Sequence, residues 1–226
     1  MTIALVVFDM AGTTVREGGA VYRGLRETLA AHGLQVSAEQ VERVKGMDKR
    51  EALRVLIAAS SFRDQLGAHV DVIHREFVAR LMAAYRADRS VSEIPGASAT
   101  FRRLHEHGIL TALDTGFSRD IAQDLIDRLG WERDGLIDTS VTSDEVEHGR
   151  PQPFMIHEVM RRLGVTDPRQ VVKVGDTPVD VLEGRNAGCG LVVGVTAASG
   201  SRASLAAAAP DHLIDSVADL PALLGL

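Results

Sequence analysis

Cysteine is almost absent from this chain of 226 residues, and long hydrophobic runs are missing as well. The single Cys189 excludes an intramolecular disulfide framework and fits a reducing compartment. It lies among small residues before an apolar segment, so we expect a small buried side chain and not a nucleophile. No apolar stretch approaches the roughly 20 residues that span a bilayer, and no basic region precedes the short apolar run at the start. We therefore expect a cytoplasmic protein without a signal peptide or a membrane partner.

Basic residues are also in deficit, with 25 Lys and Arg against 31 Asp and Glu and a formal net charge of −6. This balance argues against a broad nucleic-acid-binding surface, so we expect no nucleic-acid partner, although a local basic patch could still bind a small anionic substrate. Hydrophobic residues make up 45% of the chain, and a chain of this length buries roughly 70% of its extended surface. The composition predicts one globular domain, or one domain with an insertion.

The first apolar run, residues 3–8, indicates a fully buried strand because it is short and rich in β-branched side chains. It ends at Asp9, and a loop with Gly12 and two threonines follows. A carboxylate at the C-terminal end of a buried parallel strand lies in the crevice where open α/β sheets bind ligands. There Asp9 could attack phosphorus as a covalent nucleophile. The alternative is an aspartate that only caps the strand end or the next turn.

Two kinds of pattern divide the rest of the chain. Between about residues 16 and 92 the sequence shows helical periodicity and almost no strand signal, whereas from residue 94 helices and strands alternate. Alternation of this kind implies a parallel sheet with helices on both faces. We therefore predict an α/β core of residues 1–15 and 93–226, with a helical cap of residues 16–92 inserted after the first strand.

The predicted strands after the first are 109–114, 136–139, 170–175, 191–196 and 213–214. The predicted cap helices are one that ends at residues 32–33, a short one that begins after Ser37, 49–59 and 68–87. The predicted core helices are 95–107, 118–129, 153–163, 179–187 and a C-terminal one.

The ends of the later strands carry groups suited to phosphoryl transfer. Thr115 and Gly116 precede a predicted helix, where a hydroxyl and backbone N–H groups can hold phosphate oxygens, although Thr115 could simply cap that helix. Arg150, fixed between a glycine and a proline, can direct a permanent positive charge at an anion; a solvated surface arginine is the alternative.

Asp176 and Asp180 form a further pair, the first at a predicted strand end and the second on the entering turn of a helix. This pair suits a hard cation such as Mg²⁺, which takes one or two carboxylates together with water and substrate oxygens. Helix capping is the alternative role for Asp176. The histidines show no metal-ligand spacing.

These four segments, in this order and at these separations, resemble the haloacid dehalogenase (HAD) superfamily of phosphohydrolases. The resemblance covers the whole chain and implies a Rossmann-like parallel-sheet core with the helical insertion as its cap. It implies that Asp9 becomes an aspartyl phosphate, that Arg150 replaces the usual Lys or Arg, and that Mg²⁺ is the cofactor. The implied metal ligands are Asp9, the carbonyl group of Ala11, Asp176 and Asp180. The implied phosphate-binding residues are Ala11, Gly12, Thr13, Thr115, Gly116 and Arg150.

Ala11 departs from the ordinary phosphatases of this superfamily, which carry a second aspartate two residues after the nucleophile. That aspartate acts as general acid and base, and an alanine has no proton to give. The phosphonatase branch, which hydrolyses phosphonoacetaldehyde, also has alanine in a similar motif. In that branch a cap lysine forms a Schiff base with the substrate aldehyde, so that an enamine leaves phosphorus in place of a carbanion.

The segment 38–50 resembles the matching part of the phosphonatase cap, where the reactive lysine follows a glycine by three residues. Lys49 follows Gly46 by three residues and is therefore the candidate catalytic lysine, with a solvated surface lysine as the alternative. Lys45 is either a second cation that lowers the proton affinity of Lys49 or a surface group. Lys45, Ala52 and the loop 17–20, which lacks a cysteine, differ from the phosphonatases and point to a related substrate.

The sequence leaves three functions open. The leading one is a Mg²⁺-dependent hydrolase of phosphonoacetaldehyde or a related carbonyl-bearing phosphonate, with Asp9, Lys49 and Arg150 as its catalytic residues. The second is a phosphatase of a small phosphate monoester whose leaving group departs without an acid. The third is a catalytically silent regulator that binds phosphate. By resemblance, a homodimer through the cap is also expected.

Overall fold

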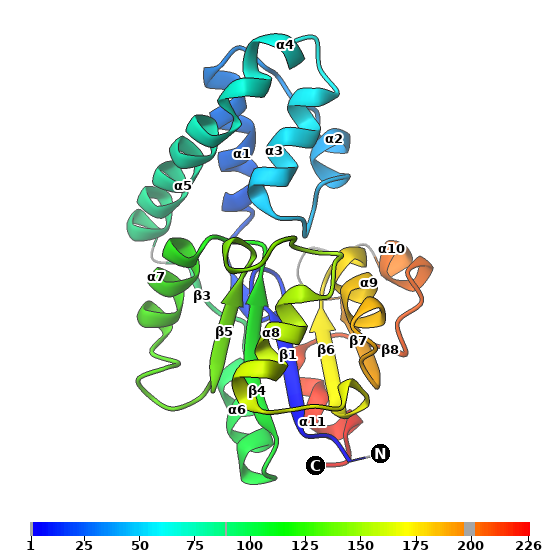
Figure 1. Cartoon of the computed structure of the whole chain (residues 1–226). Coiled ribbons are helices and arrows are strands. Elements are labelled where there is room, and N and C mark those ends of the chain that lie inside the picture. The colour runs from blue at the N-terminus through cyan, green and yellow to red at the C-terminus, as the bar shows by residue number, and fades with distance from the viewer. Residues whose placement is uncertain (1, 89, 197–201) are drawn as a thin grey trace.

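A six-stranded sheet forms the centre of the computed structural model, which describes residues 2–88, 90–196 and 202–226. The strands are β1 (Leu5–Asp9), β4 (Leu110–Thr115), β5 (Thr139–Thr142), β6 (Val171–Gly175), β7 (Leu191–Val195) and β8 (His212–Ile214). Their order is β5-β4-β1-β6-β7-β8, and every neighbouring pair is parallel (Figure 1). The predicted α/β fold with a parallel sheet is therefore confirmed.

Strand β1 is buried on both faces, which explains its unbroken apolar sequence. Alternate side chains point to opposite faces of a strand, and here they enter two different clusters. Val6 and Phe8 belong to the larger cluster, whereas Leu5 and Val7 belong to the smaller one. The core helices that cover the two faces are α6 (Ala97–Glu106), α7 (Arg119–Leu129), α8 (Phe154–Leu163), α9 (Pro178–Asn186), α10 (Arg202–Ala207) and α11 (Leu220–Leu223).

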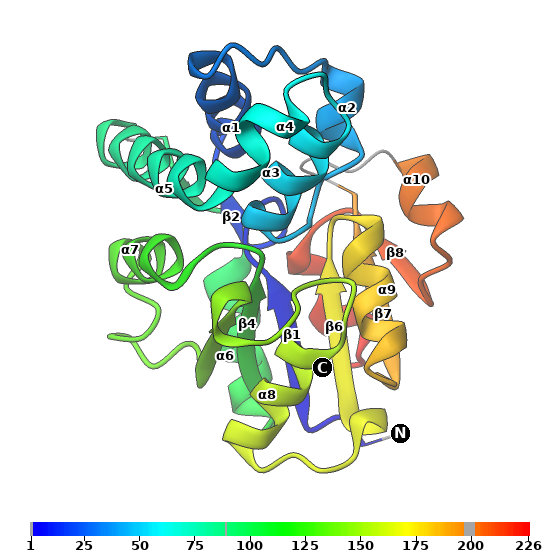
Figure 2. The same cartoon turned by 45° about the horizontal axis from the view of Figure 1, so that its top comes forward.

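The cap lies over the carboxyl ends of the strands (Figures 1 and 2). Its helices are α1 (Ala20–Ala31), α2 (Ala38–Glu42), α3 (Lys49–Ala58), α4 (Arg63–Leu66) and α5 (Val70–Ala87). Ser37 closes a capping box at the start of α2, and Asp48 caps α3 by accepting the backbone N–H of Glu51. The larger hydrophobic cluster continues from the sheet into α1, α3 and α5, so the cap packs on the same core as the sheet.

Most predicted elements lie within two residues of the observed ones, but the strand predicted at 136–139 is wrong. Leu136 and Ile137 are buried and apolar, yet pairing with β4 begins only at Thr139, opposite Ala112. The backbone N–H of Leu136 instead bonds to the carbonyl of Trp131, which closes the turn after α7. The apolar residues alone therefore placed the start of this strand too early in the chain.

Three short elements were not predicted. The helices α4 and α10 are two of them, and the third is an antiparallel ribbon of β2 (Val15–Arg16) and β3 (Ser92–Glu93). This ribbon joins the segments that lead into and out of the cap helices. The domain boundaries at 15/16 and 92/93 stay a prediction.

Four 3-10 turns complete the described part of the chain: Gly67–His69, Ser143–Glu145, Pro168–Gln170 and Val217–Asp219. Cys189 is buried in the smaller hydrophobic cluster, as expected of a small core side chain, and burial raises the pKa of its thiol to about 12. Among the described helices, none combines the length and the apolar character that a membrane span requires.

Candidate active site

The loops after β1, β4 and β6 meet beneath the cap around one small cavity. Asp9 and Asp114 lie side by side in register at the ends of β1 and β4, so Thr115 follows directly beside the nucleophile candidate. The cavity has a volume of about 20 Å³, close to that of a single water-sized probe. Seven of the predicted site residues line it: Asp9, Ala11, Lys49, Thr115, Gly116, Arg150 and Asp176.

The loop after Asp9 is held by its own backbone. Gly12 adopts a φ of 94°, which favours glycine, and its N–H bonds to the carbonyl of Val15 at 2.9 Å. The Thr14 hydroxyl donates to the carbonyl of Asp9 at 2.9 Å. The hydroxyl of Thr13 donates to Oδ1 of Asp176 at 3.3 Å, and its role as a phosphate ligand stays a prediction. The loop therefore fixes Asp9 and ties it to the end of β6.

Arg150 lies at the centre of a buried charge network. Its Nη1 is 2.6 Å from Oδ1 of Asp9 and 2.9 Å from Oδ1 of Asp180, its Nε is 2.9 Å from Oε2 of Glu183, and its Nη2 contacts Asp114. The sequence predicted that this guanidinium binds phosphate. In the structure it holds the nucleophile candidate itself and is almost completely buried.

Three members of this network were not identified from the sequence: Asp114, Lys173 and Glu183. Lys173 is the one charged residue of β6, and its Nζ contacts Asp114 and lies 2.9 Å from Glu183. A lysine inside an otherwise apolar buried strand is a sequence signal for such a network, because an isolated buried charge is costly. Glu183 lies three residues after Asp180 on α9, a spacing that places both on one helix face.

The two buried carboxylates that share these cations titrate differently. Burial acts to raise the pKa of Asp114, but Arg150 and Lys173 outweigh it and hold that pKa below its ordinary value. Burial and the charge of Asp114 raise the pKa of Glu183 to about 8. Asp114 therefore keeps its charge, and Glu183 is the member of the pair that takes up a proton first.

Asp9, Asp176 and Asp180 form a buried acidic cluster in which one oxygen of each lies within 4.8 Å of the others. Burial raises the pKa of Asp9 to about 6, against the opposing effect of Arg150. Burial and the charges of Asp9 and Asp180 raise the pKa of Asp176 well above its ordinary value. A divalent cation would relieve this repulsion, and carboxylate oxygens are hard ligands of the kind that Mg²⁺ prefers, so the donor set fits the predicted metal.

Asp114, Asp180 and Glu183 are a second close group of carboxylates. Lys173 contacts both Asp114 and Glu183 and so already supplies a positive charge to this group, and we therefore assign the metal to the first one. In that assignment Asp9, Asp176 and Asp180 would hold Mg²⁺ beside the carbonyl group of Ala11.

Lys49 is 4% exposed, although a lysine at the start of a helix is usually solvated. Its Nζ donates to the carbonyl of Met47 at 2.6 Å and lies 6.0 Å and 5.7 Å from the ring centroids of Tyr22 and Phe117. Burial lowers the pKa of Lys49 to about 8, with the carboxylates of Asp48 and Asp9 acting against that shift. The cap therefore presents an amine with a lowered pKa to the same cavity as Asp9.

Lys45 does not line this cavity. Its Nζ lies 2.5 Å from Oε2 of Glu42, and Arg150 is the cation with the largest effect on the pKa of Lys49. Ala52 is fully buried inside the cap. In the loop 17–20, Glu17 accepts the backbone N–H groups of Gly19 and Val21 and so caps α1.

A family model for haloacid dehalogenase-like hydrolases matches residues 3–188. The chain therefore belongs to the haloacid dehalogenase-like hydrolases and is an enzyme of that family. Among curated relatives, the phosphonoacetaldehyde hydrolase of Bordetella pertussis is 33% identical over 252 residues, covering 97% of this chain and 90% of the relative. The phosphonoacetaldehyde hydrolase of Bacillus cytotoxicus is 34% identical over 202 residues, covering 83% of this chain and 74% of the relative.

Solved structures share the fold at lower identity. A phosphonoacetaldehyde hydrolase like protein from Oleispira antarctica has a TM-score of 0.85 at 23% identity and covers 100% of this chain and 92% of its own. A structure named as a predicted phosphoglycolate phosphatase, from Haemophilus somnus, has a TM-score of 0.77 at 20% identity, with 98% of each chain covered. These likenesses confirm the HAD-type α/β core with its inserted helices.

Proposed function

We propose that this protein is a Mg²⁺-dependent hydrolase that cleaves the C–P bond of phosphonoacetaldehyde or of a related carbonyl-bearing phosphonate. The observation that carries the proposal is Lys49, a buried amine with a lowered pKa that lines the same cavity as Asp9 and Ala11. Two curated relatives named phosphonoacetaldehyde hydrolase, at 33% and 34% identity, support the same reaction class.

In the first step, the neutral amine of Lys49 attacks the substrate carbonyl and water leaves, which gives an imine. Protonation of the imine nitrogen makes the group an electron sink next to the C–P bond. The lowered pKa of Lys49 favours this chemistry, because a larger fraction of the amine is unprotonated at neutral pH.

In the second step, a carboxylate oxygen of Asp9 forms a bond to phosphorus as the C–P bond breaks. The electron pair of that bond moves into the imine and leaves an enamine on Lys49. Water then hydrolyses the aspartyl phosphate to phosphate, and protonation and hydrolysis of the enamine release the aldehyde and free Lys49. When bound, Mg²⁺ would supply positive charge to balance the phosphonate oxygens and the carboxylates.

Ala11 is consistent with this route, because an enamine leaving group needs no general acid at that position. A phosphate monoester hydrolase is the second candidate, in line with the solved neighbour named as a phosphoglycolate phosphatase. That reaction gives Lys49 no catalytic role. It also requires an alcohol to leave without the proton that ordinary phosphatases supply from an aspartate at the position of Ala11.

The test measures acetaldehyde and phosphate together after incubation with Mg²⁺ and phosphonoacetaldehyde, for wild type and Lys49→Arg. We expect equal release of both products by wild type and none by the variant, since arginine keeps the charge but forms no imine. Lys45→Arg is the matched control and should retain activity, because Lys45 lies outside the cavity. Equal release by wild type and Lys49→Arg would refute the imine route, and release from phosphate esters alone would establish the second candidate.

A further inference from the structure

The loop before α3, residues 46–48, packs tightly against the core. A methyl group on Gly116 would lie 2.7 Å from the carbonyl oxygen of Met47, and one on Gly149 would lie 3.2 Å from Cβ of Asp48. A methyl group on Gly46 would clash with Thr177 at the start of α9. Glycines therefore allow this cap loop to contact three core loops at once.

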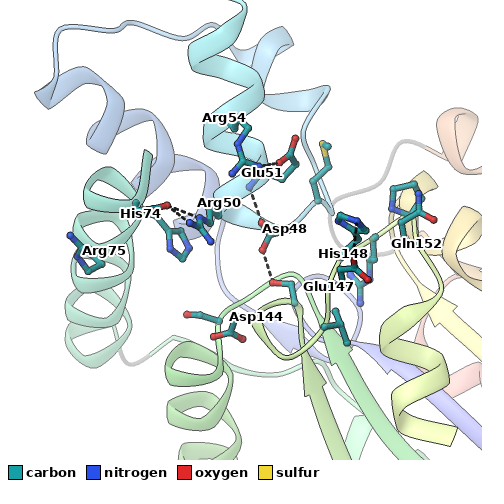
Figure 3. A pocket seen from close by; sticks show the side chains of 18 residues that line it. Asp48, Arg50, Glu51, Arg54, His74, Arg75, Asp144, Glu147, His148 and Gln152 are labelled. Carbon is teal, nitrogen blue, oxygen red and sulfur yellow. Dashed lines mark hydrogen bonds and ion pairs between the residues drawn. The ribbon is translucent and has the colours of Figure 1, made fainter. Parts of the chain in front are cut away.

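Asp48 joins the cap to the core at this contact. Its Oδ2 accepts the hydroxyl of Ser143 at 2.6 Å, across 95 residues of sequence, and its Oδ1 accepts the N–H of Glu51 at 2.7 Å. Asp48 and Ser143 both line an open groove of about 920 Å³ between the cap and the core (Figure 3). One carboxylate thus fixes the first turn of α3 and the loop after β5 together.

We propose that Asp48 is a positioning residue whose bond to Ser143 holds the cap closed and thereby keeps the amine of Lys49 inside the cavity. The significance of this contact for catalysis rests on the proposed function, but the contact itself can be tested without turnover. Lys49 follows Asp48 directly, so any displacement of Asp48 from Ser143 moves the start of α3 and withdraws the amine from Asp9.

Several charged and titratable groups face the Lys49 amine from the surrounding elements. They are Asp48 before α3, Asp9 at the end of β1, Arg150 before α8, Asp180 on α9 and Tyr22 on α1. All but Asp48 and Tyr22 belong to the core, so closure of the cap creates most of this environment. Opening of the cap would return Lys49 to water.

Amine labelling measures this closure, because a reagent reaches a side chain that is 4% exposed only when the cap opens. The chain has three lysines, Lys45, Lys49 and Lys173, so peptide mass spectrometry can follow each one. Loss of a hydrogen bond to a charged group shifts an equilibrium by about tenfold or more. Ser143→Ala should therefore raise the labelling rate of Lys49 about tenfold or more, while that of the half-buried Lys45 changes little.

The experiment applies a pulse of acetic anhydride to the Mg²⁺-loaded protein and compares wild type with Ser143→Ala, Ser143→Thr and Ser118→Ala. Threonine keeps the hydroxyl and should restore slow labelling. Ser118 lines the same groove, but its hydroxyl has no partner in the described part of the chain, so its alanine variant should behave as wild type. Gly149→Ala gives a second route, because its methyl group would lie 3.3 Å from Cβ of Ser143 and push that residue and Asp48 apart.

We expect Lys49 to be labelled faster in Ser143→Ala and Gly149→Ala than in wild type. Labelling should stay slow in Ser143→Thr and Ser118→Ala. Wild-type labelling in Ser143→Ala would overturn the proposal, and so would equal acceleration in Ser118→Ala, which would indicate general loosening. The proposed imine route is tested independently of this contact: it would be refuted if unlabelled wild type released no aldehyde from phosphonoacetaldehyde.

Discussion

At the scale of single residues, the site consists of ionisable side chains that are held out of water. Burial pushes the pKa of Asp9 up to about 6 and that of Lys49 down to about 8, so both groups titrate close to neutral pH. A carboxylate and an amine act as nucleophiles only after each has lost its proton, and both groups are deprotonated above about pH 8. The activity of each therefore depends on its surroundings and not on its residue type alone.

Imine formation should rise with pH through about 8, because Lys49 reacts as the neutral amine. Asp48→Asn should move this midpoint to lower pH, since it removes a carboxylate that raises the pKa of Lys49. Asparagine still caps α3 and can donate to Ser143, so the position of the loop is kept. The measurement is the rate of borohydride trapping of a carbonyl phosphonate against pH.

Glu51→Gln is the matched control for this shift. Glu51 lies in the first turn of α3 and pairs with Arg54, and it is not among the charges with the largest effect on Lys49. Its variant should keep the wild-type midpoint. A midpoint that is unchanged or higher in Asp48→Asn would contradict the electrostatic account of Lys49.

Lys49→Met should stabilise the protein at pH 7 while abolishing C–P cleavage. The folded state lowers the pKa of Lys49 from 10.5 to about 8, so at pH 7 the buried charge costs on the order of 3 kcal/mol. Between pH 8 and 10.5 the unfolded chain binds more protons than the folded one, so wild-type stability rises with pH and the difference should narrow. Urea unfolding at pH 7 and pH 10 measures this, and lower stability of the variant at pH 7 would contradict it.

The sequence predicted Asp9, Thr115 and Asp176 as site residues because each lies at or just after the end of a short apolar run that predicts a buried strand. Lys49 needed the resemblance to the phosphonatases, since its burial depends on contacts with the core that lie far away in sequence. Asp114 and Glu183 were missed because their role depends on contacts with Arg150 and Lys173, which lie on other elements of the fold.

At the scale of elements, the parallel strands bring their carboxyl ends together and so concentrate charge. Strand β6 contributes Lys173 from its interior and Asp176 from the loop that follows it. Burial and Arg150 act to lower the pKa of Lys173, but Asp114, Glu183 and Asp180 outweigh them and raise it. The strand is therefore stable only with its counter-charges in place.

Lys173→Met should destabilise the fold by about 3–5 kcal/mol, because it leaves the buried charge of Asp114 with fewer partners. Above about pH 8, where Glu183 is ionised, adding Glu183→Gln should recover part of that loss, since it removes the second carboxylate that Lys173 neutralises. Urea unfolding of the single and double variants measures the coupling. Strictly additive losses would show that the two side chains do not act as a pair.

Mg²⁺ should raise the free energy of unfolding by about 2–3 kcal/mol at a concentration near 100 times its Kd, because it binds only the assembled cluster. Asp176→Asn should remove most of this effect, whereas Asp144→Asn, on the adjacent groove, should keep it. The measurement is thermal or urea unfolding with Mg²⁺ and with a chelator. The same stabilisation in wild type and Asp176→Asn would exclude this cluster as the metal site.

The predicted elements were accurate where a periodic pattern of apolar residues extended over many residues. Helix α5 buries Val70, Ile73, Phe77, Leu81 and Tyr85, as its spacing predicts. The predicted bounds of strand β5 were wrong because Leu136 and Ile137 are buried in the turn after α7, before the strand begins. Buried apolar residues alone do not show where a ladder of hydrogen bonds starts.

At the scale of the whole molecule, the sheet and the cap each contribute one wall of the cavity, with Asp9 on the sheet side and Lys49 on the cap side. In the proposed reaction the sheet would therefore act on phosphorus and the cap would supply the amine. The cavity between them holds only about 20 Å³, so a phosphonate can enter only when the cap moves. The larger hydrophobic cluster runs through both parts, and the short β2–β3 ribbon joins the segments that lead into and out of the cap. A homodimer through the cap stays a prediction.

Borohydride trapping tests the central claim most directly. The enzyme is mixed with Mg²⁺, phosphonoacetaldehyde and sodium borohydride, and its peptides are mapped by mass spectrometry. Reduction of the imine that remains after C–P cleavage should leave an ethyl group on Lys49, with Lys45 and Lys173 unmodified and activity lost in proportion. Release of phosphate and acetaldehyde with no adduct on Lys49 would contradict the account.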